Sequence, residues 1–156
     1  MTSPAGWPSS WPVAERAGRV LALDLGEARI GVALTDAERT VALPHGTIRV
    51  AGGVEDLRAV AALVGQTDAT EVVVGHPLGL SGDRGPAARR AEAFAQGLRQ
   101  LMPEVPVHLQ DERLSTVEAE RGLREAGASG PRRRSRVDAA AASVILEGWL
   151  SRAREP

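Results

Sequence analysis

The stretch that most constrains the fold is RVLALDLGEARIGVALTD, which holds two apolar runs separated by a glycine. Residues 19–25 form the first run, and in residues 28–36 apolar side chains alternate with other types. Alternation with a period of two is typical of a half-buried strand, and a short break that contains glycine joins two strands into a hairpin. We therefore predict a β-hairpin in which Asp24 is the only acid of the first run.

The rest of the chain reads as one further strand followed by alternating helices and strands. A third strand is expected within residues 40–50, with Pro44 near its middle. Helical spacing and apolar runs then predict, in order, a helix at 54–66, a strand at 71–77, a helix at 86–102, a strand at 105–110 and helices at 115–126 and 135–151. The fold class is therefore α/β, with a mixed five-stranded sheet of three antiparallel meander strands and then parallel strands, and helices on both faces.

Length and composition set broad limits on the domain and its chemistry. A chain of 156 residues is sufficient for one domain, which we place at residues 19–151 between a flexible leader at 1–18 and a short tail at 152–156. The chain has no cysteine, so thiolate metal sites and cysteine nucleophiles are excluded. No apolar stretch is long enough to cross a bilayer, and a cytoplasmic protein without a membrane partner is expected.

Charge is balanced over the whole chain but uneven along it. The net charge is −1, and all 19 basic residues are arginine. Four of them, Arg132, Arg133, Arg134 and Arg136, lie in the segment PRRRSR, where their guanidinium groups could hold phosphate in a bidentate manner. Aromatic residues are only 3% of the chain, which argues against a stacking platform for bases.

Acidic residues gather at three points of the predicted fold. Asp24 lies within the first strand, Asp111 and Glu112 follow the strand at 105–110, and Asp138 falls in the expected first turn of the last helix. Structural explanations remain open for each. Asp24 could accept bonds from turn amides, the second pair could decorate a solvated turn, and Asp138 could complete a capping arrangement that begins at Ser135.

The three points together indicate a cation site if the fold brings them to one edge of the sheet. Carboxylates within a few ångströms of one another repel strongly and are tolerated mainly around a divalent ion. Hard oxygen ligands select Mg²⁺ or Mn²⁺. A pocket of carboxylates is the usual holder of two such ions, about 4 Å apart, which clamp an in-line phosphoryl displacement.

Four motifs resemble, in order and spacing, the YqgF/RuvX family of ribonuclease H-like proteins. They are LALDLGEARIGVALTD, VVVGHPLGLSGD, DERLSTVEAE and RVDAAAASVILE, and the match covers about residues 19–151. The family is described as Holliday junction resolvases and as nucleases that process pre-16S ribosomal RNA. The resemblance implies a ribonuclease H-like fold and a metal-dependent endonuclease that acts on structured RNA or branched DNA.

The resemblance also implies roles for single residues. Asp24 corresponds to the first-strand catalytic acid that bridges two Mg²⁺ or Mn²⁺ ions, Asp111 or Glu112 to the second ligand, and Asp138 to the acid of the last helix. Arg113 would contact phosphate, although pairing with its neighbouring acids is equally open. The arginines at 132–134 and 136 would bind the nucleic-acid backbone, with Arg89 and Arg90 as further candidates.

Three further residues near the motifs carry expectations of their own. Gly26 and Gly31 are expected where a side chain would block the approach of substrate or of a neighbouring strand. His76 is expected to be a plain turn residue, with a proton carrier as the alternative.

Ribosomal RNA maturation is preferred to junction resolution as the cellular role, by family implication alone. Resolution requires two symmetric cuts and so predicts a homodimer. A non-catalytic nucleic-acid-binding module on the same fold is a second alternative. An ATP-handling protein of the actin-like kind is a third, but it needs two lobes around the nucleotide, which 156 residues do not supply.

Overall fold

The computed structural model describes residues 18–112 and 131–153 of the chain. Five strands form one sheet, and their bounds are β1 (Arg19–Leu25), β2 (Arg29–Thr35), β3 (Ala42–Arg49), β4 (Ala69–His76) and β5 (Val107–Asp111). The order across the sheet is β3-β2-β1-β4-β5. The first three strands are antiparallel neighbours, and β4 and β5 add in parallel beside β1. The predicted mixed five-stranded sheet is confirmed.

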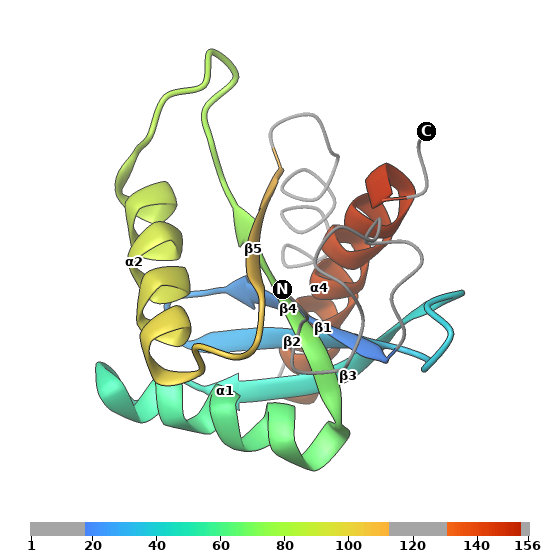
Figure 1. The fold of residues 1–156 in the computed structure, drawn as a ribbon. Coiled ribbons are helices and arrows are strands. Elements are labelled where there is room, and N and C mark those ends of the chain that lie inside the picture. Colours follow the sequence, from blue (N-terminus) through green and yellow to red (C-terminus); the bar gives the residue numbers. More distant parts are fainter. Residues whose placement is uncertain (1–17, 113–130, 154–156) are drawn as a thin grey trace.

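Helices cover both faces of the sheet, as predicted. The described helices are α1 (Val54–Thr67), α2 (Pro86–Leu101) and α4 (Pro131–Ala153). Figure 1 shows α1 and α2 on one face and α4 on the other. Each face has its own buried cluster, because alternate strand residues point to opposite sides: Leu21 packs on the side of α1 and α2, and Ala22 on the side of α4.

The third strand accommodates its proline because of where the strand lies. β3 is at the edge of the sheet, so only one of its sides must pair. The register between β2 and β3 shifts between Val32 and Ala33, and Ala33 lies opposite Pro44. Proline cannot donate to a strand ladder and is tolerated at edges and bulges. Pro44 therefore lies beside a bulge within one continuous strand.

The last helix begins earlier than the sequence interpretation placed it. α4 starts at Pro131, not near Ser135. Proline is favourable at the first position of a helix, since its missing N–H would have no partner there. Asp138 consequently lies about two turns inside the helix, so its expected place in the first turn is wrong, and the capping alternative falls with it. The leader at residues 1–18, apart from Gly18, and the helix expected at 115–126 lie outside the described residues.

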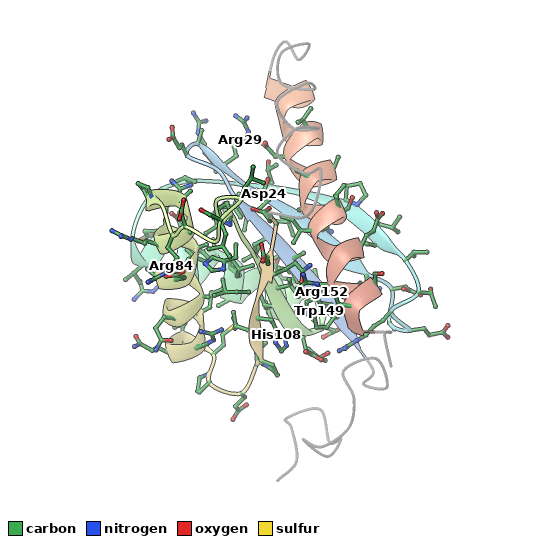
Figure 2. The ribbon with its side chains drawn as sticks, turned by 90° about the horizontal axis from the view of Figure 1, so that it is seen from above. Asp24, Arg29, Arg84, His108, Trp149 and Arg152 are labelled. Atoms are coloured by element: carbon green, nitrogen blue, oxygen red, sulfur yellow. The ribbon has the colours of Figure 1, made fainter. Side chains whose placement is uncertain are left out.

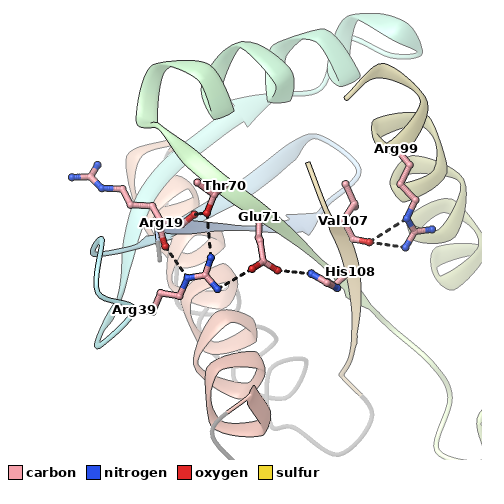
Figure 3. Close-up of polar contacts among 8 residues, drawn as sticks. Arg19, Arg39, Thr70, Glu71, Arg99, Val107 and His108 are labelled. Carbon is pink, nitrogen blue, oxygen red and sulfur yellow. Dashed lines mark hydrogen bonds and ion pairs between the residues drawn. The ribbon is translucent and has the colours of Figure 1, made fainter. Parts of the chain in front are cut away.

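A buried ion cluster ties the sheet together at the end where β1 and β4 begin. Glu71 of β4 is completely buried and accepts hydrogen bonds from Arg39 Nη1 at 2.9 Å and from His108 Nε2 at 2.6 Å (Figure 3). Arg39 has a positive φ of 59° and also donates to the carbonyl oxygen of Gly18. Burial opposes the ionisation of Glu71, but the bonds and charges of His108 and Arg39 outweigh it and lower the pKa of the carboxyl. The cluster joins β4 to β5 and to the turn after β2.

Among the described residues, no helix is both long and apolar enough to span a membrane.

Replacing Glu71 by glutamine should destabilise the fold by roughly 2–3 kcal/mol, because an amide nitrogen would then face a donor of Arg39 or His108 in the interior. The pKa of Glu71 is lower in the folded chain than its ordinary value of 4.5. Its stabilising effect is therefore present above pH 4.5 and is lost as the pH falls through the folded value. Urea unfolding of wild type and Glu71→Gln should show a gap that is constant near neutral pH and shrinks in acid. The exposed Glu104→Gln is the control, and an equal loss in both variants would contradict this role.

Candidate active site

The first acid lies on the face of the sheet that α4 covers. Val20 and Ala22 of β1 pack in the cluster beside α4, and Asp24 has the same parity along the strand. Only 6% of Asp24 is exposed. Asp24 therefore lies on the same buried face of β1 as Val20 and Ala22, near the end of the strand.

A glycine brings the last helix to this acid. Gly31 of β2 is the register partner of Asp24. A Cβ atom on Gly31 would lie 2.1 Å from the carbonyl oxygen of Asp138, a distance that no side chain can occupy. The glycine thus lets the backbone of α4 lie directly on β2, and it places Asp138 beside the strand pair that carries Asp24. A close approach does occur at Gly31, but the approaching element is the helix α4 and not the expected substrate or strand.

The hairpin turn contains the second glycine of the motif. The N–H of Gly26 donates to the carbonyl oxygen of Arg29 at 2.9 Å. A Cβ atom on Gly26 would lie 2.5 Å from that same oxygen. Glycine is therefore required at position 26 for the tight turn between β1 and β2.

The two acids at the end of β5 lie on opposite faces of the sheet. His108 and Gln110 lie toward α4, where they contact Trp149 and Gly148. Glu112 follows the same parity, and its N–H donates to the carbonyl oxygen of His76 at 3.1 Å. Glu112 is 6% exposed and its Oε1 atom is fully buried.

The neighbouring strand makes room for this carboxylate. A Cβ atom on Gly75 of β4 would lie 2.8 Å from Glu112 Oε1. Asp111 has the opposite parity, shared with Val107 and Leu109 of the other cluster. Glu112 is thus the acid that faces α4.

Asp24, Glu112 and Asp138 line one cavity of about 360 Å³, which we call the acidic cavity. Asp111 is not part of its lining. The cavity lies at the carboxyl ends of β1 and β4, the edge where open α/β sheets bind ligands. Its described lining holds four carboxylates and two guanidinium groups, which belong to Asp24, Glu27, Glu112, Asp138, Arg29 and Arg90.

The two arginines of the cavity are held in different ways. Arg29 Nε donates to Asp138 Oδ2 at 2.7 Å. Arg90 of α2 donates instead to the carbonyl oxygen of Leu25. Figure 2 shows Asp24 and Arg29 beside the N-terminal half of α4. The sequence interpretation missed Arg29, although its parity on β2 matches that of Gly31 and so assigns it to the face of α4.

The donor set of the acidic cavity fits a hard divalent cation. Three of its acids are at most 9% exposed, and carboxylate oxygens are the ligands that Mg²⁺ and Mn²⁺ prefer. Within the described residues, no three acids or histidines are close enough together to surround one ion as they stand. One of the three buried acids, Asp138, is engaged by Arg29.

His76 belongs to a different contact. It is the last residue of β4, and its Nε2 lies 2.6 Å from Glu92 Oε2 on α2. Arg84 also binds Glu92, and the hydrogen bonds from Arg84 and His76 lower the pKa of Glu92 to about 2. The imidazole ring therefore connects the end of β4 to α2, and His76 is not in the lining of the acidic cavity.

Residues 77–85 form a loop that follows β4 and His76 (Figure 1).

A second cavity, of about 310 Å³, lies at the other end of α4. Its lining includes His108, Trp149 and Arg152, which Figure 2 shows grouped together. The lining contains no carboxylate among the described residues, so this cavity offers no alternative site for a hard cation.

The predicted phosphate contacts lie largely outside what the structure describes. Arg113 is not among the described residues. The backbone of residues 132–136 is the first turn and a half of α4, but the side chains of Arg132, Arg133, Arg134 and Arg136 are not described. Their roles stay predictions.

The chain is similar to proteins of one family. A family model described as "RuvX: Holliday junction resolvase" matches residues 18–152. A protein of Anaeromyxobacter sp. (strain Fw109-5), named "Putative pre-16S rRNA nuclease", is 49% identical over 132 residues, which cover 85% of this chain and 96% of the relative. A protein of Thermobifida fusca (strain YX) with the same name is 49% identical over 146 residues and covers 89% and 91% of the two chains.

Among solved structures, the fold is similar to that of RuvC. The T. thermophilus RuvC structure in complex with a Holliday junction substrate aligns with a TM-score of 0.52 and 16% identity, over 86% of this chain and 96% of RuvC. At this identity the likeness concerns the fold alone.

Replacing Gly31 by alanine should push α4 away from β2 and open the acidic cavity, with a loss of stability of about 2–4 kcal/mol. The matched control is Gly46→Ala on the adjacent strand β3, where a Cβ atom would meet nothing within 4 Å. Thermal unfolding of both variants checks this expectation. Equal melting temperatures for the two variants would show that the contact with Asp138 is not a constraint.

Proposed function

We propose that this chain, which belongs to the RuvX family, acts through its domain at residues 19–151 as a divalent-metal-dependent endonuclease. Its proposed substrate is structured nucleic acid, and its proposed role is the maturation of the 5′ end of pre-16S ribosomal RNA. The observation that carries the proposal is that Asp24, Glu112 and Asp138, from three distant parts of the chain, line one cavity. The names of the relatives supply the substrate. A cytoplasmic location is part of the same proposal.

Three acids would hold the cofactor, which we take to be two Mg²⁺ or Mn²⁺ ions. Asp24, Glu112 and Asp138 offer oxygen ligands from side chains that are themselves largely buried, which strengthens their attraction to a cation. Of the two acids that the sequence left open, Glu112 is the one we assign, because Asp111 does not line the cavity. When bound, divalent ions in such a site neutralise charge on phosphate oxygens and make water more acidic.

Arginine residues would receive the substrate. Arg90 reaches the cavity from α2 and donates to the carbonyl oxygen of Leu25. A backbone carbonyl carries no net charge, so this bond does not neutralise the guanidinium group. A guanidinium group there suits a phosphodiester oxygen. The arginines at 113, 132–134 and 136 would hold the nucleic-acid backbone without reading bases. Hydrolysis would leave a 5′-phosphate and a 3′-hydroxyl.

Resolution of Holliday junctions is the second candidate, and the description of the family model is what favours it. The two functions differ in substrate and not in the proposed chemistry of the site. Junction resolution further requires a homodimer, because two strands must be cut symmetrically. A non-catalytic nucleic-acid-binding module on the same fold is the remaining alternative, and it would have no use for a cation at the acidic cavity.

Asp24→Asn should abolish cleavage and leave nucleic-acid binding unchanged or stronger, because the variant loses a metal ligand and a charge that repels phosphate. We expect a rate at least about 100-fold lower, since the charge stabilisation that metal ions provide amounts to several kcal/mol. The assay compares a precursor 16S RNA fragment with a four-way DNA junction, each in Mg²⁺ and in Mn²⁺. Faster cleavage of the RNA supports maturation, and faster cleavage of the junction supports resolution.

The matched control is Glu27→Gln, which removes one negative charge from an exposed position of the same cavity. This variant should keep most of the activity. Undiminished cleavage by Asp24→Asn, or an equal loss in both variants, would refute the assigned site.

A further inference from the structure

The ion pair between Arg29 and Asp138 sits where the proposed cofactor needs a ligand. Arg29 Nε lies 2.7 Å from Asp138 Oδ2, and the two side chains are 24% and 12% exposed. The residues are 109 positions apart in the chain and meet only because α4 packs on β2. Both line the acidic cavity. The positive charge that balances Asp138 thus comes from the protein itself.

The geometry of the ion pair between Arg29 and Asp138 allows another cation to replace Arg29. Only one hydrogen bond joins the pair, and it uses Nε, whereas the strongest arginine–carboxylate contacts are bidentate. A single hydrogen bond holds the pair less firmly than a bidentate contact would, so a stronger partner can replace it. A divalent ion at Asp138 would be such a partner, because it carries twice the charge and neighbouring acids attract it as well.

We propose that Arg29 is a tethered counter-ion, which holds Asp138 until a divalent cation displaces it and then binds a substrate phosphate. The inference rests on the proposed function. In the free protein Arg29 relieves the repulsion among the buried acids. In the loaded protein its guanidinium group is released within the same cavity, at the place where a phosphodiester would lie beside the ions.

Arg90 provides the internal comparison. It lines the same cavity and carries the same charge, but it donates to the backbone carbonyl of Leu25 and not to an acid. Removing either arginine changes the charge of the cavity equally. Only the removal of Arg29 frees a carboxylate that the cation needs, so the two variants separate direct competition from a general electrostatic effect.

The first test measures Mn²⁺ binding without nucleic acid, by calorimetry and by electron paramagnetic resonance of free Mn²⁺. Arg29→Gln should bind Mn²⁺ about three- to tenfold more tightly than wild type, and Arg90→Gln should show a clearly smaller change. Arg29→Lys keeps the charge near Asp138 and should bind close to the wild-type affinity. Circular dichroism and melting temperature verify that each variant is folded.

The second test measures cleavage at saturating Mn²⁺. Arg29→Gln should cleave about tenfold or more slowly, because one charged contact to phosphate is lost. Tighter metal binding together with slower cleavage is the signature of the proposed exchange. A merely structural role for Arg29 would weaken both.

The outcomes distinguish this inference from the proposed function. Equal Mn²⁺ affinities of Arg29→Gln and Arg90→Gln, or weaker binding by Arg29→Gln, would overturn the role of Arg29 while leaving the metal site intact. Wild-type protein that binds no Mn²⁺, or binds it just as well after Asp24→Asn, would overturn the proposed function and this inference with it.

Discussion

The close contact between α4 and β2 at Gly31 is the constraint on which the rest of the site depends. A carbonyl oxygen of α4 occupies the space that any side chain at position 31 would fill. Through this contact Asp138, which is far along the chain, comes to the strand pair that carries Asp24. The same face receives Glu112, because Gly75 leaves room for its carboxylate. The absence of a side chain at Gly31 and at Gly75 therefore allows the three acids to lie in one cavity.

Three carboxylates in one cavity repel one another, and nearby positive charges reduce this repulsion. Buried carboxylates in one cavity repel one another unless a cation compensates them. Arg29 and Arg90 supply part of that compensation within the described lining. The carboxylate oxygens of this cavity are also the ligands that a hard divalent ion prefers. At the opposite end of the sheet, Glu71 is fully compensated by Arg39 and His108 and belongs to the framework.

The sequence predicted the fold well because its local patterns agree with the final packing. The period of two in the first hairpin and the helical spacing of α1 and α2 mark which side of each element is buried. The start of α4 was misjudged because Ser135 and Asp138 imitate a capping pair, whereas Pro131 is the true signal. The choice between Asp111 and Glu112 required knowing which face α4 covers. The pairing of Arg29 with Asp138 has no local signal, since it joins residues 109 positions apart.

We propose that Asp24, Glu112 and Asp138 together bind the divalent cations. The most direct measurement is anomalous diffraction at the manganese absorption edge from crystals of the wild-type protein soaked in Mn²⁺. We expect an anomalous peak within the acidic cavity, in contact with carboxylate oxygens of all three residues. A cavity without a peak under conditions that saturate other sites, or a peak that none of these acids contacts, would contradict it.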